Sequence, residues 1–301
     1  MKCSSRHNLF GIASNDSRQL SAKESLWMFK EAGFEAIDMG FGGVGRPGYE
    51  LTGDDWERKV DELGNEAARL GLTFSQIHMP SLKGEKDPRF KVPGFEEEFY
   101  LAMERALIAA GRLGAPWAVA HALNPKDAGN DPDKAKKLNH EYYDKYVELG
   151  IKNGVGFAFE NMIQGKDGGP KLRYTAHYSE LIDYVDSFND PMVQICWDFG
   201  HANITGFDQC VGLRKVGKRL KCVHIDDNFG NLDHHLIPFS GKVDWHKIMP
   251  VLAEIGYEGE CNLEVQNHFN RMPRELHKLM GRHAFEACDY LRKLIEDARQ
   301  M

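Results

Sequence analysis

Polar side chains stand at the ends of several short apolar runs in this chain. They are His78, His121, Glu160, Asp198, His224 and Glu264. A lone histidine at such a position is most often a hydrogen-bonded structural residue, but a carboxylate inside an apolar run needs a partner, because burying an unpaired charge is costly. Three such carboxylates brought to one place would repel each other, and a divalent cation would remove that repulsion. The residue types therefore predict a metal site.

The spacing of four of these residues matches a repeating strand–helix unit. The four are Glu160, Asp198, His224 and Glu264. Each gap between consecutive members accommodates one helix and one strand, so they would come from four consecutive strands. Three carboxylates and one imidazole form an oxygen-rich set that suits Mn²⁺, Mg²⁺ or Co²⁺ in roughly octahedral geometry, with positions left for a substrate. Zn²⁺ becomes an alternative if further histidines take part.

Short apolar runs alternate with helical patterns along the chain. The runs, whose length and Val, Ile and Phe content suit buried parallel strands, are Asn8–Ala13, Glu35–Phe41, Thr73–Met79, Pro116–Ala122, Gly156–Asn161, Val193–Asp198, Lys221–Asp226 and Glu260–Val265. The helix candidates are Ser21–Ala32, Asp54–Leu70, Phe95–Leu113, Asp133–Lys152, His177–Ser187, Asp208–Lys218, Asp244–Ile255 and Arg274–Arg299. Eight such units predict a (β/α)8 TIM barrel of the α/β class, as one domain over residues 1–301. The carboxyl ends of its strands would meet at one mouth, where active sites are built.

Local signals refine this outline. Ser21 and Glu24 form a capping-box pattern at the start of the first helix, and several helices pass to the next strand through a glycine, which tolerates the left-handed turn there. These glycines are Gly33, Gly71, Gly114 and Gly256. The long segments Phe41–Gly53 and Met79–Phe95 are candidate lids over the mouth. Because side chains alternate along a strand, Trp197 should face the outer helices.

Composition places limits on partners and location. The 301 residues carry a net charge of −7 at pH 7 and a pI near 6.0, which gives no basic footprint for nucleic acid or anionic membranes. No run approaches the ~18 apolar residues of a membrane span, and the N-terminus lacks the apolar core of a secretory signal. The six cysteines form no C-x-x-C pair, so we expect reduced thiols in a cytoplasmic protein.

Five segments of the C-terminal half resemble the xylose isomerase-like TIM barrel superfamily, in particular its sugar (and sugar phosphate) isomerase/epimerase branch. They are Phe159–Met162 (FENM), Trp197–Gly206 (WDFGHANITG), Val223–Asn228 (VHIDDN), Asp233–Trp245 (DHHLIPFSGKVDW) and Gly256–Val265 (GYEGECNLEV). Their order and spacing are specific to the superfamily rather than to one reaction. The N-terminal half is similar more loosely, through its strand rhythm and through His78 and His121.

The resemblance implies a metal-dependent sugar isomerase or epimerase. Its metal ligands would be Glu160, Asp198, His224 and Glu264, with Mn²⁺ favoured. Glu160 and Glu264 would also be the catalytic pair: one removes a proton from a carbon next to a carbonyl, the metal stabilises the resulting enediolate, and the other returns a proton. The residues expected to border a carbohydrate or polyol substrate are His78, His121, His201, Asp233 and His235. A homodimer is common in this family.

One departure from the family pattern concerns the substrate. Where the pattern often reads Asp-Arg-His-Leu, residues 233–236 read Asp-His-His-Leu, and Phe239 and Ser240 replace a Gly-Glu pair. An arginine there could help to hold an anionic substrate, so its replacement by His234 argues against a phosphorylated one. Phe239 favours a more apolar pocket wall, suited to an aryl or glycosidic group.

Three alternatives share the scaffold. Lyases, such as dehydratases of inosose or dehydroshikimate type and enzymes that cleave C-glycosides, use the same enolisation and then expel a β-substituent. Endonuclease IV-type DNA repair enzymes hold three zinc ions, and their ligand pattern can be laid on this chain almost completely. The acidic net charge and the lack of a basic, aromatic stripe on the expected mouth loops argue against a nuclease. A sugar-binding role without catalysis is the third alternative.

Overall fold

The computed structural model describes residues 1–16, 18–46, 48–81, 88–124, 126–163 and 173–300. Eight parallel strands form its inner ring, in the order β7-β6-β5-β4-β3-β2-β1-β8. The backbone N–H of Ile225 donates to the carbonyl of Asn262, and that of Glu264 donates to the carbonyl of Ile225, at 2.8 and 3.0 Å. These bonds join the two ends of the sheet, so the strands form a nearly closed barrel and the predicted fold is confirmed.

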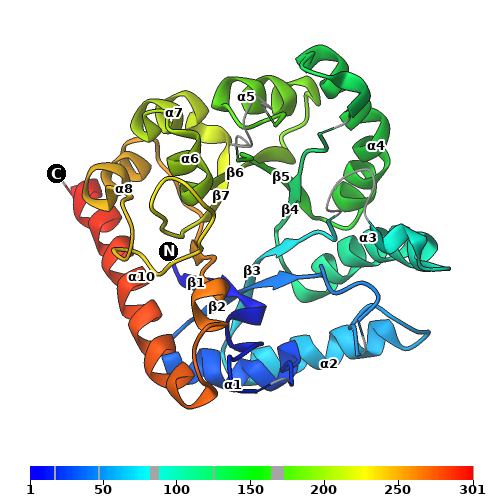
Figure 1. The fold of residues 1–301 in the computed structure, drawn as a ribbon, viewed down its shortest axis with the longest axis vertical. Coiled ribbons are helices and arrows are strands. Elements are labelled where there is room, and N and C mark those ends of the chain that lie inside the picture. The colour runs from blue at the N-terminus through cyan, green and yellow to red at the C-terminus, as the bar shows by residue number, and fades with distance from the viewer. Residues whose placement is uncertain (17, 47, 82–87, 125, 164–172, 301) are drawn as a thin grey trace.

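Helices ring the strands on the outside of the barrel (Figure 1). The strands are β1 (Cys3–Arg6), β2 (Ala36–Gly40), β3 (Thr73–His78), β4 (Trp117–His121), β5 (Gly156–Glu160), β6 (Val193–Asp198), β7 (Leu220–His224) and β8 (Cys261–Leu263). The α-helices are α1 (Ala22–Ala32), α2 (Trp56–Arg69), α3 (Phe95–Leu113), α4 (Pro132–Lys152), α5 (Tyr178–Ser187), α6 (Phe199–Thr205), α7 (Gln209–Val216), α8 (Trp245–Glu254), α9 (Gln266–Phe269) and α10 (His277–Gln300). Every predicted helix, and every predicted strand except the first, is confirmed with ends shifted by a few residues at most. The short helices α6 and α9 were not predicted.

The predicted first strand, Asn8–Ala13, is wrong. The first strand is Cys3–Arg6, which pairs with β2 and β8, and a short 3-10 helix follows it. The apolar signal of the predicted run comes from packing against helices, since the ring of Phe10 lies 5.1 Å from that of Phe29 in α1. The true strand lacks this signal because its own residues Ser4, Ser5 and Arg6 are polar. The Ser4 hydroxyl lies 2.7 Å from a serine hydroxyl of β3.

The predicted helix ends are also found. The capping box of α1 is complete, because the Ser21 N–H donates to the Glu24 carboxylate at 2.8 Å and the Glu24 N–H donates to the Ser21 hydroxyl at 3.3 Å. The four glycines predicted after helices all have positive φ. The unpredicted α6 is capped by Asp198, which accepts a 2.6 Å hydrogen bond from the N–H of His201. This cap fixes Asp198 where β6 ends.

The apolar core has two layers. The larger lies between the strands and the helices, and Trp197 belongs to it, as alternation predicts, with its indole N–H donating to Gln209 of α7 at 3.2 Å. The smaller cluster lies inside the barrel and consists of Val119, Ala158, Cys196 and Cys222, with Trp117 packed against it. Above this small cluster the barrel interior is polar, and charged side chains occupy the mouth.

Other expectations concern thiols, membrane spans and loops. All six cysteines are free and buried, and the reduced state of their thiols stays a prediction. Across the described ranges, no helix is long and apolar enough to cross a membrane. In the candidate lid Phe41–Gly53, the Tyr49 hydroxyl donates to the Phe41 carbonyl at 2.7 Å. The other candidate lid, Met79–Phe95, includes residues 82–87, which lie outside the described residues.

Candidate metal centre

The four predicted ligands meet at the C-terminal mouth of the barrel. Glu160, Asp198 and His224 are the last residues of β5, β6 and β7, and Glu264 directly follows β8. All are buried, with exposed fractions of 8% or less. One potential ligand atom of each lies within 4.8 Å of those of the other three. Four consecutive strands thus bring one donor atom each to a common point, as their spacing predicts.

Nδ1 of His224 lies in the middle of this group. It is 2.9 Å from Oε2 of Glu264 and 3.1 Å from Oε2 of Glu160, and 3.8 Å from Oδ2 of Asp198. Nevertheless, neither this nitrogen nor the Asp198 oxygen forms a hydrogen bond to a described residue. Buried polar atoms without partners are costly. A divalent cation would satisfy both atoms, and this donor set fits Mn²⁺, Mg²⁺ or Co²⁺.

Two residues of β3 orient the His224 ring. The side-chain amide of Gln76 and Nε2 of His224 form a 2.9 Å hydrogen bond. The ring of His78 stacks on that of His224, with centroids 4.4 Å apart and an angle of 14° between the planes. These contacts turn Nδ1 toward the three carboxylates. Such outer partners commonly fix the orientation of a metal-binding histidine.

Two histidines predicted to border the substrate contact Glu160. Nε2 of His121 lies 3.0 Å from Oε2 of Glu160, and Nδ1 of His201 lies 3.0 Å from Oε1. Nδ1 of His201 also lies 2.8 Å from the carbonyl oxygen of Asn161, which can accept its proton. Both oxygens of this carboxylate therefore have a histidine partner.

Of the other three residues predicted to border the substrate, His78 and His235 contact Glu264, and Asp233 contacts His235. Asp233 links two histidines, with Oδ2 at 2.9 Å from Nε2 of His235 and 3.6 Å from Nε2 of His201. Nδ1 of His235 lies 2.7 Å from the carbonyl oxygen of Glu264, and Nε2 of His78 lies 3.7 Å from its Oε2. The structure thus brings all nine predicted site residues together, and their individual roles stay predictions.

Neighbouring cations set the charge of the two glutamates. Burial raises the pKa of Glu160, but His224 and His121 outweigh burial and hold this pKa well below its usual value. Burial also raises the pKa of Glu264, and His224 and Arg6 hold it well below its usual value. Both glutamates are therefore ionised, as a metal ligand or a proton acceptor must be.

Protons take part in holding the centre together when no cation is bound. Burial raises the pKa of Asp198 to about 6. Burial lowers the pKa of His224, but its neighbours Cys196, Glu160 and Glu264 raise it well above the usual value. The His224 ring therefore attracts a proton into the group of carboxylates. A divalent cation would take the place of that proton.

A model of the family described as xylose isomerase-like TIM barrel matches residues 28–293. The chain belongs to this family. That range runs from α1 into α10 and contains all the predicted site residues. The resemblance inferred from the five C-terminal segments is therefore confirmed.

Several known proteins are similar to parts of the chain. It is 34% identical over 97 residues to fructoselysine 3-epimerase of Escherichia coli O157:H7, covering 32% of each chain. It is 29% identical over 106 residues to inosose dehydratase of Clostridium tetani, covering 29% of this chain and 36% of that one. The chain spans about half or less of the length of the curated relatives it matches. The solved structure of D-psicose 3-epimerase from Clostridium cellulolyticum H10 has a TM-score of 0.72 at 17% identity, over 98% of this chain and 99% of that one, and shows the shared fold.

Asp38 of this xylose isomerase-like barrel escaped the sequence analysis. It is buried in β2 and accepts hydrogen bonds from the side chains of His78, Gln76 and Asn262, at 3.0, 3.2 and 3.1 Å. Asp38 is itself a carboxylate inside an apolar run. A carboxylate inside an apolar run is the same sequence signal that identified Glu160, so the sequence could have predicted Asp38 as well.

Arg6 escaped as well, because the wrong placement of the first strand hid it. It ends β1 and its side chain is 13% exposed. Nη1 lies 3.4 Å from Oε1 of Glu264, and Nε lies 4.0 Å from Oδ2 of Asp38. No apolar run marks this strand, so only the pairing seen in the structure places Arg6 at the mouth.

Asp226 is a further buried carboxylate near the centre. Neither of its oxygens forms a hydrogen bond within the described part of the chain. With Asp233 and His235 it makes another group of close potential ligand atoms. Burial raises the pKa of Asp226 well above its usual value, and Asp198 adds to the rise.

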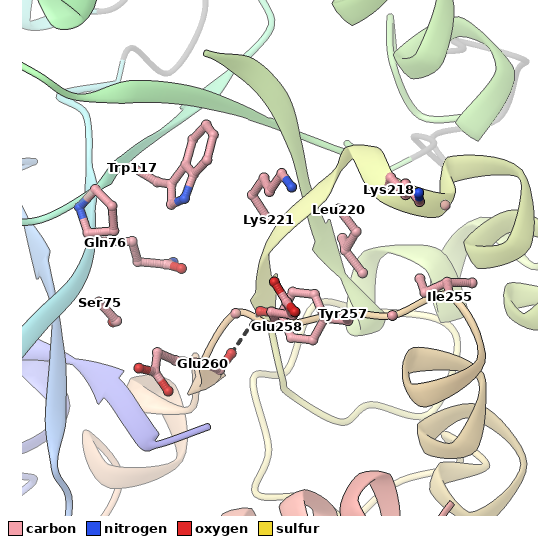
Figure 2. A pocket seen from close by; sticks show the side chains of 14 residues that line it. Ser75, Gln76, Trp117, Lys218, Leu220, Lys221, Ile255, Tyr257, Glu258 and Glu260 are labelled. Atoms are coloured by element: carbon pink, nitrogen blue, oxygen red, sulfur yellow. Dashed lines mark hydrogen bonds between the residues drawn. The ribbon is translucent and has the colours of Figure 1, made fainter. Parts of the chain in front are cut away.

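A cavity of about 550 Å³ lies at the opposite, N-terminal end of the barrel. Trp117, Leu220 and Glu260, from the starts of β4, β7 and β8, are among the residues that line it (Figure 2). Gln76 also lines it and is the link between this cavity and His224. No predicted site residue lines the cavity, and in such barrels this end serves stability rather than catalysis.

Proposed function

We propose that this chain is a divalent metal-dependent sugar epimerase or isomerase. The observation that carries the proposal is the placement of Glu160 and Glu264. The two carboxylates come from strands separated by β6 and β7, yet Oε2 of each approaches the same atom, Nδ1 of His224, at 3.1 and 2.9 Å. Two carboxylates beside one sugar carbon can remove a proton and return one.

The four residues that would hold the cation are Glu160, Asp198, His224 and Glu264, and Mn²⁺ is our first choice. When bound, a divalent cation polarises the carbonyl and hydroxyl oxygens of a sugar, which makes the neighbouring C–H more acidic. His121 and His201 hold Glu160 through its two oxygens. His201 and Asp233 present polar atoms that can bind substrate hydroxyls.

The proposed reaction removes one proton from carbon and adds another to carbon. One glutamate removes the proton from the carbon beside the carbonyl. The C–H electron pair becomes the C=C bond of an enediolate, and the carbonyl oxygen takes the negative charge. The second glutamate, having drawn a proton from solvent, delivers it to the opposite face, which inverts the centre. Delivery to the neighbouring carbon gives the isomer instead.

The names of similar proteins support a small carbohydrate as substrate. One relative is a fructoselysine 3-epimerase and one structural neighbour is a D-psicose 3-epimerase. A cytoplasmic location and a homodimer are further parts of this proposal. The buried, free thiols agree with a reducing compartment.

The proposal is tested by proton exchange. Protein loaded with Mn²⁺ is incubated in D₂O with D-fructose, D-tagatose and their C3 epimers, and deuterium at carbon is followed by NMR. Glu160→Gln and Glu264→Gln should each slow exchange by roughly 10²- to 10⁴-fold, the usual contribution of a general base. Glu254→Gln is the matched control, because Glu254 pairs with Arg214 on the outer helices. Metal-loaded protein that binds sugars without any exchange contradicts the proposal.

A lyase is the second candidate, favoured by the inosose dehydratase among the relatives. It would use the same first proton removal and then expel a β-substituent, such as water, in place of proton return. The two candidates differ in product mass. Loss of 18 mass units, detected by mass spectrometry, would mean elimination, whereas an epimerase or isomerase leaves the mass unchanged in H₂O.

A further inference from the structure

Arg6 places a guanidinium group at the edge of the candidate metal centre. Its Nη1 lies 3.4 Å from Oε1 of Glu264. The other oxygen of the same carboxylate, Oε2, lies 2.9 Å from Nδ1 of His224. Only one carboxylate group therefore separates the guanidinium from the point where the four ligands meet.

The enclosed donors of this guanidinium are unused. Nε and Nη1 of Arg6 are shielded from solvent and form no hydrogen bond to any residue that the structure describes. The carboxylates of Asp38 and Glu264 are close enough to attract the charge, but they do not accept hydrogen bonds from it. An unpaired buried donor costs free energy, so these donors are poised for an acceptor that enters the mouth.

The nearby carboxylates are committed to other partners. Asp38 already accepts from His78, Gln76 and Asn262. Oε1 of Glu264 accepts from the Gln266 amide at 3.4 Å, and its Oε2 faces His224. Both carboxylates thus have other partners, and neither accepts a hydrogen bond from Nε or Nη1 of Arg6 in this arrangement.

The backbone of β2 makes room for the guanidinium. A Cβ atom on Gly40, the last residue of β2, would lie 2.8 Å from Nη2 of Arg6. The glycine therefore lets the side chain lie across the strand end.

We propose that the substrate carries a carboxylate that Arg6 binds, which makes ketohexuronates the substrate class. This inference rests on the proposed function, because the same molecule must also present its carbonyl and hydroxyl oxygens to the metal centre. The planar fork of arginine matches a carboxylate with two parallel charge-assisted hydrogen bonds. The short separation between Arg6 and the ligands suits a carboxylate on the same short carbon chain.

The test compares acidic and neutral sugars of equal length. Mn²⁺-loaded protein is assayed with D-tagaturonate and D-fructuronate against D-tagatose and D-fructose, and kcat/KM is measured for each. We expect the uronates to be preferred by at least about tenfold. Because Arg6 also lies 3.4 Å from Glu264, its loss is expected to slow turnover of both classes of sugar. Arg6→Gln should therefore lower the ratio of kcat/KM for the uronates to kcat/KM for the neutral sugars by roughly 10- to 100-fold, the range for a hydrogen bond to a charged group. Arg214→Gln, on the outer surface, is the control and should change neither.

Two further variants guard against a folding defect. Arg6→Lys keeps the charge that faces Asp38 and loses the fork, so it should recover part of the uronate activity. Gly40→Ala leaves Arg6 in the sequence but displaces its guanidinium, so it should again lower activity on uronates more than on neutral sugars. Equal losses on both classes in these variants would overturn the inference.

Binding separates this inference from the proposed function. D-tagaturonate is titrated calorimetrically into the Mn²⁺-loaded protein and its Arg6→Gln variant. Tight binding that depends on Arg6, without proton exchange at carbon, would support the carboxylate site and refute the epimerase. Exchange with neutral ketoses or ketose phosphates in preference to uronates would keep the epimerase and overturn the carboxylate site.

Discussion

The two halves of the barrel mouth contribute differently to the centre. Strands β5 to β8 supply the four candidate ligands, and two of their atoms, Nδ1 of His224 and Oδ2 of Asp198, are buried without partners. Strands β1 to β3 supply side chains that contact those ligands from outside the group, such as Gln76 and His78 beside His224 and Arg6 beside Glu264. Under the proposed function, β5 to β8 would bind the cation and β1 to β3 would position the binding groups.

Of the changes that test this difference, metal removal should have the largest effect on activity and stability. We expect protein purified without added metal to hold about one Mn, Mg or Co per chain, counted by plasma mass spectrometry. Chelation should abolish proton exchange. A cation present at a thousand times its Kd contributes about 4 kcal/mol, so the melting temperature should fall by on the order of 10 °C.

The metal count also separates the alternatives. Two or three zinc ions per chain, together with cleavage of abasic duplex DNA, would favour the endonuclease IV-type reading over the epimerase. In that case the group His78, His121 and Glu160, whose potential ligand atoms also lie within 4.8 Å of one another, would hold one of the ions.

Replacing a ring from each half should sharpen the comparison. His224→Ala removes a ligand, so metal content should fall below about a tenth of an ion per chain and exchange should be lost, since three carboxylates without the imidazole repel each other. His78→Ala removes a ring that stacks on His224 at 4.4 Å, so the variant should keep most of its metal. If His78→Ala lost a whole ion per chain, His78 would be a ligand. The ligands would then not come from β5 to β8 alone.

The sequence predicted the site residues of β5 to β8 better than those of β1 to β3. Glu160, Asp198 and His224 stand out because each is a polar residue at the end of an apolar run. The residues next to them in these runs face the helices. Arg6 sits in a strand of polar residues, Cys3–Arg6, that no hydrophobic pattern marks. Pairing with β2 and β8 holds this strand in place. Local residue types do not predict pairing between segments that lie so far apart in the sequence. The rule that predicted Glu160 also applies to Asp38, but Asp38 was missed.

Removing a positioning contact should weaken metal binding less than removing a ligand. Gln76→Ala deletes the amide that bonds to Nε2 of His224 at 2.9 Å. Outer partners of this kind are worth about 10- to 100-fold in metal affinity, so Kd for Mn²⁺, measured by calorimetry, should rise by that factor. Ser75→Ala on the same strand is the control, because its hydroxyl pairs with Ser4. An unchanged Kd in Gln76→Ala would mean that His224 is oriented by other contacts.

The smallest expected effect is that of pH on metal affinity. Burial lowers the pKa of His224, but Cys196, Glu160 and Glu264 raise it well above its usual value, so near neutral pH the free centre carries a proton that a cation must displace. Lowering the pH therefore strengthens the competitor, and affinity for Mn²⁺ should fall about tenfold per pH unit for each proton released. Calorimetry in two buffers of different ionisation enthalpy counts those protons. Binding that releases none would mean that His224 is already neutral in the free centre, and that the ligand half is preformed rather than held together by its protons.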